Sequence, residues 1–469
     1  MSETAALLQE RKEIFQVLYQ GGIPKRVPVN SPITLELATA YVGENLVEVS
    51  YDLPRLEAIF EKICQDFVAD SFPVAGVGRS PLFYQILGSK PFVMSSTGSM
   101  QHPDVVGMLP EEYSDLITKP LDYLMDTVVP RLYTELDTDS SQKAMVFAKA
   151  MRIQTDVMME NFMIQRKVAA KYGYPAIGMM GGTGPMKTTL APLDYLADLL
   201  RSFKGLSSDL RRYPTQVLAA CETLLPLMIK RGLPNIPGEP GVTFIPLHMA
   251  TFIRNKDFEK FYWPTFIQLV RALDEAGQTI VIFLEDDWTR YLDYVYDLPA
   301  NCRLMVEYGD PQLFKDKLGK KHYLTGFYPA TLLHSGNKDQ CVDKAKELLD
   351  ILAPGGRYQF SYDKQIIATT ANSKLMENIK AVMQYVEENG AYDHPDKVED
   401  LVFTDKSAQV QRAKEIVANI NQNIDSKYYT TWEKYKALHP ELEGKPEHII
   451  APKIQHYEEQ MIHFLINLC

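Results

Sequence analysis

Short apolar runs alternate with helical stretches along most of this chain. The runs are rich in β-branched and aromatic residues, which is typical of buried strands. Strands are therefore predicted at 26–32, 66–73, 174–182, 242–248, 279–285, 302–310, 322–329 and 357–363. Eight strands that alternate with helices predict an α/β fold, a TIM-type (β/α)8 barrel with a parallel sheet. An open, doubly wound parallel sheet is the alternative.

The segments between these runs predict helices with recognisable ends. Residues 257–276 place acidic side chains in the first turn, and the segment stops before Gly277. Pro264 lies inside this segment, so we expect either a kink or a late restart of the helix. Residues 338–352 predict a further helix, and the turn-rich stretch 95–104 predicts a loop.

The last part of the chain differs from the rest, because the strand pattern stops after about residue 390. Residues 407–424 and 446–469 predict helices, with a third helical stretch between them. We therefore expect a barrel over 1–390 and a helical C-terminal extension over 391–469. The extension is expected to cover the barrel wall or to form a dimer contact, and a docking surface for a partner is the alternative.

Composition narrows the class of protein. The formal net charge of the 469 residues is −11, and this acidity argues against binding to nucleic acid. No run of 18 apolar residues predicts a membrane span, and the charged N-terminal stretch does not have the apolar core of a signal peptide. The five cysteines are widely spaced, so neither a disulfide framework nor a cysteine-based metal site is expected. These features predict a cytoplasmic enzyme.

Two consecutive predicted strands end in residues that can bind metal or transfer protons. His248 closes the run 242–248, and Glu285 closes the run 279–285. Residues at the carboxyl ends of barrel strands line the active site, so we expect these two side chains to converge. A carboxylate after an apolar run also needs a partner, because an unpaired buried charge is costly. His248 and Glu285 are therefore the expected catalytic residues, either as acid/base groups or as ligands of a zinc ion.

The third ligand that a catalytic zinc requires is left open, with Glu307 and Asp363 as candidates. Asp287 shares the strand parity of Glu285, whereas Asp286 is expected to cap the next helix or to hold Arg290.

Four further residues at strand ends are expected to contact substrate. They are Asn30, Asp70, Tyr328 and Asp363. For Asn30 and Asp70 the alternative is capping of a helix or turn, which Asn and Asp favour. For Tyr328 it is a wall of the pocket. The glycine-rich stretch 181–185 lacks the spacing of a phosphate-binding or dinucleotide-binding loop, so an ordinary loop is expected there.

Several motifs together resemble the uroporphyrinogen decarboxylase superfamily. They are RVPV at 26–29, PEEYSDLI at 110–117, IPLHMATFI at 245–253, DFEKFYWPTFIQLVRALDEAG at 257–277, VIFLEDD at 281–287, LTGFYPATLLHSG at 324–336 and the glycine pair at 355–356. The resemblance covers roughly residues 10–390, and FYWP with the following LEDD is its most specific part. These features resemble the branch of cobamide-dependent methyltransferases, which work with a small corrinoid protein.

Two departures from the superfamily pattern refine this resemblance. The segment 30–40 has no arginine, although decarboxylases of uroporphyrinogen carry one there to bind propionate groups. Decarboxylation of uroporphyrinogen is therefore disfavoured. The thiol-methylating members hold zinc on an HxC pair and a later cysteine, but this chain has His248, Met249 and Ala250, and no cysteine at 361–364. His248, Glu285 and Asp363 are what remain of such a ligand set.

The resemblance implies a methyltransferase that moves a methyl group from a small methylated molecule to the Co(I) corrinoid of a partner protein. An aryl methyl ether is one candidate donor, and the reaction would be an O- or N-demethylation. Superfamily members are often dimers, so a homodimer is a further expectation. The alternatives are a decarboxylase or lyase on the same barrel, with Asp70 holding a cationic or pyrrolic group, and a non-catalytic corrinoid-binding barrel.

Overall fold

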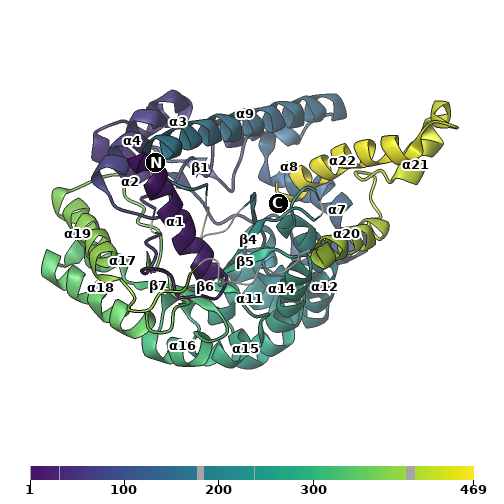
Figure 1. Ribbon diagram of the computed structural model, residues 1–469. Helices are drawn as coiled ribbons and strands as arrows, with labels where there is room; N and C mark the ends of the chain where they lie inside the picture. Colours follow the sequence, from purple (N-terminus) through teal and green to yellow (C-terminus); the bar gives the residue numbers. More distant parts are fainter. Residues whose placement is uncertain (1, 31, 177–183, 237, 398–406, 469) are drawn as a thin grey trace.

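The computed structural model describes residues 2–30, 32–176, 184–236, 238–397 and 407–468 (Figure 1). Its centre is a parallel sheet with the strand order β3-β4-β5-β6-β7-β8, so neighbours in the sheet are also neighbours in the chain. The strands are β3 (Met186–Thr188), β4 (Val242–Leu247), β5 (Thr279–Asp287), β6 (Arg303–Tyr308), β7 (Tyr323–Tyr328) and β8 (Ser361–Tyr362). Consecutive order with helical crossovers is the topology of a (β/α)8 barrel.

The first two predicted strands continue this sheet as short, irregular segments. Val29 forms a parallel bridge with Phe360, next to β8, and Ile33 forms a parallel bridge with Val74. The amide of Asp70 also donates to the carbonyl oxygen of Val29 over 2.9 Å. The stretches 26–32 and 66–73 therefore occupy the first two strand positions, and the predicted TIM-type barrel is confirmed.

The third predicted strand, at 174–182, falls mostly outside the described residues. Residues 174–176 are not in a strand, and 177–183 are not described. The described strand at this position is β3, which begins at Met186 and pairs with β4, with Met186 opposite Val242. A strand over 177–182 therefore stays a prediction.

Two apolar layers follow from the alternation of side chains along the strands. Ile245, Leu247, Ile282 and Leu284 point outward and belong to the large core between the sheet and the helices. Val242 and Val281 form a separate small cluster, packed by Phe244 and Met305. This second cluster marks the inside of the barrel.

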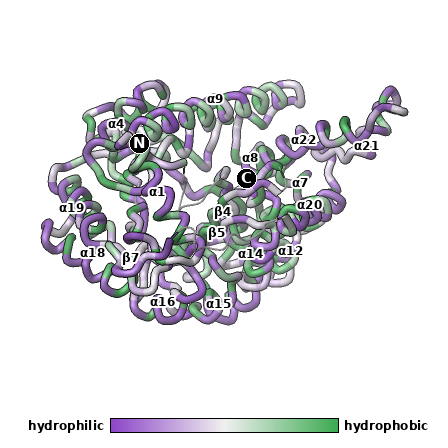
Figure 2. The backbone as a smooth tube through the Cα atoms, in the orientation of Figure 1, coloured by the Kyte–Doolittle hydropathy of each residue, from purple (hydrophilic) through white to green (hydrophobic). Residues whose placement is uncertain are grey.

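Helices surround the sheet (Figure 1). Those between β3 and residue 390 are α10 (Pro192–Tyr195), α11 (Ser202–Arg212), α12 (Pro214–Gly232), α13 (Asn255–Asp257), α14 (Trp263–Glu275), α15 (Leu292–Asp297), α16 (Pro311–Leu318), α17 (Ala330–Ser335), α18 (Lys338–Leu352) and α19 (Ser373–Asn389). Hydrophilic positions predominate on the outer turns of α16 and α18 (Figure 2). The predicted bounds of α18 are confirmed.

The predicted helix at 257–276 contains the late restart that Pro264 requires. A π-helical turn, Phe258–Tyr262, separates α13 from α14, and Pro264 is the second residue of α14. A proline is tolerated at this position because the amide it lacks would have no partner within the helix.

The first half of the chain is mostly helical. Its helices are α1 (Glu3–Tyr19), α2 (Leu35–Val42), α3 (Leu46–Tyr51), α4 (Leu56–Asp66), α5 (Pro81–Leu87), α6 (Tyr113–Thr118), α7 (Pro120–Tyr123), α8 (Val129–Leu132) and the long α9 (Ser140–Tyr172). The predicted loop at 95–104 contains β2 (Met100–Gln101), which pairs antiparallel with β1 (Val93–Met94) just before the loop, so 93–101 is a hairpin.

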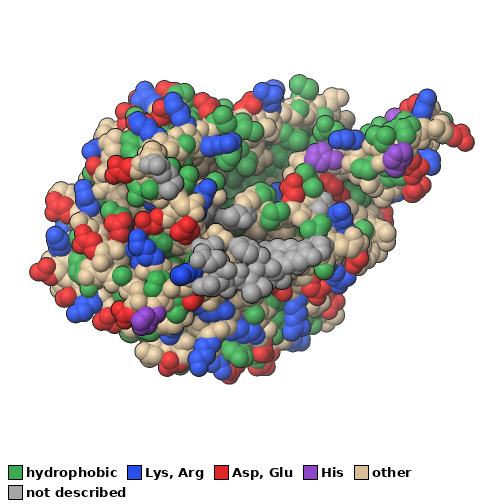
Figure 3. Space-filling view, in the orientation of Figure 1, with side chains coloured by type: hydrophobic (Ala, Val, Ile, Leu, Met, Phe, Trp, Pro, Cys, Tyr) green, Lys and Arg blue, Asp and Glu red, His purple; other side chains and the backbone are tan. Residues whose placement is uncertain are grey.

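The C-terminal extension is helical, as predicted, with α20 (Ser407–Gln422), α21 (Trp432–Leu438) and α22 (Glu447–Ile466). Figure 3 shows a face of the molecule that is hollowed between α9 and this extension, with hydrophobic side chains in the hollow. None of the helices in the described ranges combines the length and hydrophobicity needed to cross a membrane.

Candidate active site

The structure brings His248 and Glu285 together at the carboxyl ends of β4 and β5. His248 directly follows β4, and its Nε2 lies 3.1 Å from Oε1 of Glu285, which is part of β5. On the other side of the ring, Nδ1 lies 2.5 Å from Oδ2 of Asp198. The imidazole therefore has a carboxylate at each nitrogen.

Asp198 and a second acid, Asp194, are the residues of this site that sequence reasoning missed. Asp198 lies in a π-helical turn, Leu196–Arg201, directly after α10, and Asp194 lies in α10 itself. Asp194 is fully buried, and its carboxylate accepts from the amide of Met249 over 2.7 Å and from the Tyr262 hydroxyl over 2.6 Å. The sequence did contain one indication of these two residues. They are acids four positions apart, on one face of a helix, in the otherwise apolar stretch 192–200.

These carboxylates determine the charge of His248. Burial disfavours the imidazolium, but the hydrogen bonds to Asp198 and Glu285 outweigh it and raise the pKa of His248 to about 11. Burial also raises the pKa of Asp194 to about 7, an effect that the charge of Asp198 adds to and that of His248 opposes. His248 is therefore doubly protonated at neutral pH, with one N–H toward Asp198 and the other toward Glu285.

A β-bulge re-aims the acidic end of β5. The pairing of β5 with β6 shifts register between Leu284 and Asp287, and Asp286 has a left-handed φ of 62°. The amide of Asp286 donates to Oε2 of Glu307 over 2.8 Å. Because of this bulge, Asp286 lines the pocket, whereas Asp287 accepts from the amide of Thr289 over 2.9 Å.

The parity argument for Asp287 is therefore wrong, since parity holds only along a regular strand. Arg290 does not bind Asp286 either, because its guanidinium donates to the carbonyl oxygens of Ala250, Thr251 and Ile253.

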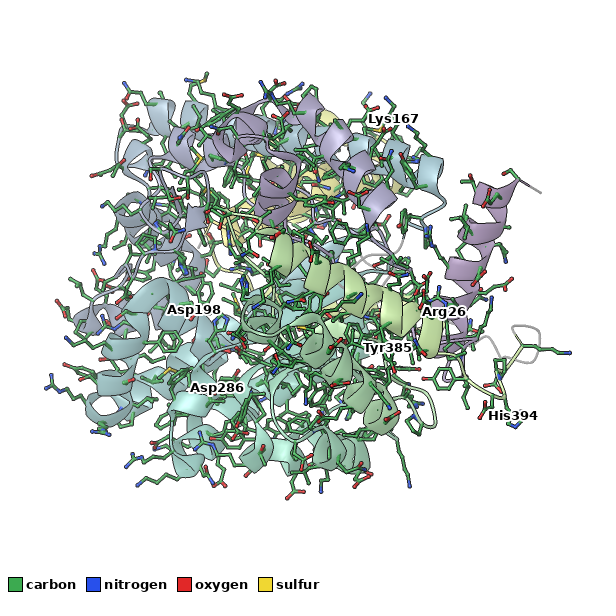
Figure 4. All side chains as sticks on the ribbon, turned by 90° about the vertical axis from the view of Figure 1, so that its left-hand side faces the viewer. Arg26, Lys167, Asp198, Asp286, Tyr385 and His394 are labelled. Carbon is green, nitrogen blue, oxygen red and sulfur yellow. The ribbon has the colours of Figure 1, made fainter. Side chains whose placement is uncertain are left out.

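His248 and Glu285 line a pocket of about 480 Å³, which we call the histidine pocket. Its other walls are His102, Pro103, Asp104, Ala197, Asp198, Phe203, Phe252, Asp286 and Glu307. Figure 4 shows Asp198 and Asp286 close together on one side of the molecule, with Arg26 on the opposite side. The lining is strongly acidic, and Lys364 forms an ion pair with Glu307 at its edge.

Three of the predicted substrate contacts lie outside the histidine pocket and bind the protein itself. Asp70 is fully buried and accepts two 2.6 Å hydrogen bonds from the Arg26 guanidinium. The Tyr328 hydroxyl donates to the carbonyl oxygen of Cys341 over 3.0 Å. Asp363 accepts from the amide of Ala330 over 3.0 Å, at the first residue of α17. Of the three, only Asp363 caps a helix, whereas Asp70 pairs with an arginine and Tyr328 with a backbone carbonyl.

Asn30 lies elsewhere, in a cavity inside the barrel. Its Oδ1 accepts from the Ser71 hydroxyl over 2.5 Å, and its side-chain amide donates to Oε1 of Gln359 over 3.5 Å. All three residues line this cavity, which has a volume of about 590 Å³.

The donor set does not fit the expected zinc site. Among the described residues, no group of three His, Cys, Asp or Glu side chains is close enough to hold a metal ion. Both nitrogens of His248 are taken by carboxylates, and the candidate third ligands are engaged as well, Glu307 with Lys364 and Asp363 with α17. The described residues therefore do not supply the ligand set of a zinc site.

Comparison with known proteins agrees with the family resemblance drawn from the sequence. Residues 174–388 match the family described as uroporphyrinogen decarboxylase (URO-D). Among solved structures, a methyltransferase from Methanosarcina mazei is similar, with 16% sequence identity, a TM-score of 0.47, and coverage of 80% of this chain and 98% of that chain. A search among curated protein sequences gives no match. The matched residues, 174–388, contain β3 to β8 and the residues bonded to His248.

Proposed function

We propose that this protein is a methyltransferase that moves a methyl group from a small methylated molecule, an aryl methyl ether being the leading candidate, to the corrinoid of a partner protein. The observation that carries the proposal is His248, which has a carboxylate at each ring nitrogen, in an open pocket at the carboxyl ends of β4 and β5. The corrinoid, held by the partner, would supply the cobalt nucleophile that accepts the methyl group. This chain would bind the donor and handle the charge of its leaving group.

Removal of a methyl group from an ether leaves the electron pair of the broken C–O bond on oxygen. A positioned group that donates a proton to this oxygen in the transition state lowers the barrier. Burial lowers the pKa of His248, but its hydrogen bonds to Asp198 and Glu285 raise it to about 11, so the ring would carry a proton for the leaving oxygen.

The two carboxylates would have different tasks in this reaction. Asp198 holds Nδ1 of His248 at 2.5 Å and would fix the orientation of the ring. Glu285 holds Nε2 at a longer 3.1 Å, and about a third of its side chain is exposed to the pocket. The Nε2 proton is therefore the one that a donor molecule can reach, and after its transfer Glu285 would favour reprotonation of the ring.

The acidic lining of the histidine pocket disfavours the decarboxylase alternative. Uroporphyrinogen carries several carboxylates, which would meet Asp104, Asp198, Glu285, Asp286 and Glu307 in this pocket. Like charges within one pocket repel, and among the described residues that line it only His102 and His248 can carry a positive charge.

The test is the rate of methyl transfer from 2-methoxyphenol to reduced cobalamin, followed by the change in visible absorbance of the cobalamin. We expect His248→Gln to lower the rate by about 10²- to 10⁴-fold, because it removes the proton donor. Glu285→Gln should lower it less, since Asp198 still holds the ring. His334→Gln, at an exposed histidine of α17, is the matched control and should retain the wild-type rate. Wild-type rates in both site variants would refute the proposal.

A further inference from the structure

The long helix α9 exposes a stripe of apolar side chains. Five of them are each more than half exposed: Met145, Met158, Met159, Phe162 and Met163. Met145, Met159 and Met163 share one side of the helix, because they are separated by nearly whole numbers of turns. An apolar stripe on a helix is normally packed against another element, and methionine is frequent at protein contacts because its side chain adapts to a partner. This side of α9 therefore lacks a partner among the described residues.

The C-terminal extension carries a second uncovered apolar surface, on a helical arm that we define as residues 432–457. Figure 1 shows α21 and the adjoining part of α22 projecting from the body of the molecule. α21 packs chiefly on α22, and the Trp432 indole donates to Glu447 over 2.8 Å. Leu438, Ile449 and Tyr457 of the arm are 73%, 56% and 71% exposed. The packing within the arm therefore leaves these three side chains in contact with solvent.

Charge limits which surface of a second copy can lie on α9. α9 contains six Lys and Arg and two Asp and Glu, a net charge of +4, whereas the whole chain carries −11. Two α9 helices would therefore repel each other, and so would the acidic surfaces of two barrels. The arm has four Lys and four Glu and is neutral. It is an exposed apolar surface that can approach α9 without repulsion of like net charge.

We infer that a second copy of this chain covers both surfaces, in a two-fold dimer in which the arm of each copy lies along α9 of the other. Both surfaces border the same hollow (Figure 3), so one two-fold axis near the hollow forms both contacts at once. α9 has 33 residues and is about 50 Å long, so two such contacts supply the roughly 20–30 residues a side that a stable interface uses. The inference goes beyond the proposed function and does not depend on methyl transfer.

The test is sedimentation velocity of the full chain over a range of micromolar concentrations. We expect the wild type to sediment as a dimer. Phe162→Glu in α9 and Leu438→Glu in the arm should each weaken the dimer by about 30-fold or more, the effect of losing a central side chain of an interface. Leu313→Glu is the matched control, because Leu313 is a 41% exposed leucine of α16, and this variant should remain a dimer.

A mixture of the two glutamate variants tests the exchange of arms directly. A mixed dimer keeps one intact contact, between α9 of the Leu438→Glu copy and the arm of the Phe162→Glu copy. The mixture should therefore form more dimer than either variant alone. Met163→Gln and Tyr457→Gln repeat the experiment without a new charge, in case a glutamate variant has a lowered melting temperature.

Three results would overturn the inference. They are a wild type that sediments as a monomer, a dimer that both variants retain, and a mixture that forms no more dimer than its components. Loss of the dimer in only one of the two variants would also overturn it, because each contact requires both surfaces.

Discussion

The charge of His248 comes from two carboxylates in different parts of the chain. Asp198 belongs to the turn after α10, and Glu285 belongs to β5, yet both lie within 3.1 Å of the same ring. Two hydrogen bonds to the charged form overcome the cost of burial, so a partly buried histidine is a stable cation. At the scale of one residue, this is the property on which the proposed chemistry depends.

We predict that His248 titrates at a pKa of about 11, and that Asp198→Asn lowers this pKa toward 6.5. The measurement is the pH dependence of the imidazole resonances by NMR. Because the folded-state pKa is raised, the charged ring stabilises the fold fully below about pH 6.5, and this contribution is lost as the pH rises toward 11. The free energy of unfolding should therefore fall more steeply between pH 7 and 11 in the wild type than in His248→Gln. Titration of His248 near 6.5 would contradict the prediction.

At the scale of an element, the bulge at the end of β5 lies directly after Glu285, whose side chain faces His248, and turns Asp286 into the same pocket. The left-handed Asp286 is anchored by its amide hydrogen bond to Glu307, one strand away in β6. A non-glycine residue in this conformation costs free energy, so a specific contact must hold it. Glu307 therefore acts on His248 indirectly, as a positioning residue.

Glu307→Leu should release this anchor, whereas Glu307→Gln keeps an oxygen that can accept from the Asp286 amide. We expect the leucine variant to lose about 1 kcal/mol of unfolding free energy, the usual value of one hydrogen bond, and to show a lowered pKa of His248. The glutamine variant should retain that pKa, although it loses the ion pair with Lys364. Denaturant unfolding and NMR titration would measure both effects. An unchanged His248 pKa in Glu307→Leu would show that the bulge is held by other contacts.

At the scale of the whole molecule, one buried ion pair joins the C-terminal extension to the barrel. Lys230 of α12 is 1% exposed and is bonded to Glu459 of α22 and, over 2.6 Å, to Asn421 of α20. Asn421 and the Tyr429 hydroxyl also donate to Glu459, over 2.7 and 3.1 Å. The extension is thus fixed on α12, which supports its expected role as a cover of the barrel wall.

Lys230→Met should lower the free energy of unfolding by about 3–5 kcal/mol, because it leaves the buried carboxylate of Glu459 without its cation. The double variant with Glu459→Leu should recover a large part of this loss, since it removes both charges. Lys436→Met, at an exposed ion pair with Glu447, should cost less than about 1 kcal/mol. Chemical denaturation of the full chain measures all three. Equal effects of the two lysine variants would mean that the extension is held mainly by its apolar contacts.

Local patterns in the sequence determined much of the fold. The apolar runs that became β4 to β7 were located from their composition, and the helix at 338–352 was located from its amphipathic pattern and the glycines after it. The order of these elements along the chain specifies a barrel, because short helical crossovers place consecutive strands side by side. His248 and Glu285 each end a predicted strand. The sequence therefore also predicted that they lie at the same end of the barrel, because all its parallel strands end on that side.

Tertiary packing alone decided which side chains meet. Asp198 reaches His248 across 50 positions of sequence, and no local pattern encodes that approach. Asp70 binds Arg26 because the first two strand segments lie side by side, and Asp286 faces the pocket because a bulge cancels strand parity. The physical reason is the separation in sequence over which each signal acts. Hydrophobic periodicity reflects the direction of side chains within a few residues. Hydrogen bonds and ion pairs, in contrast, form between residues of any separation in sequence when the packed backbone brings their polar atoms within about 3 Å.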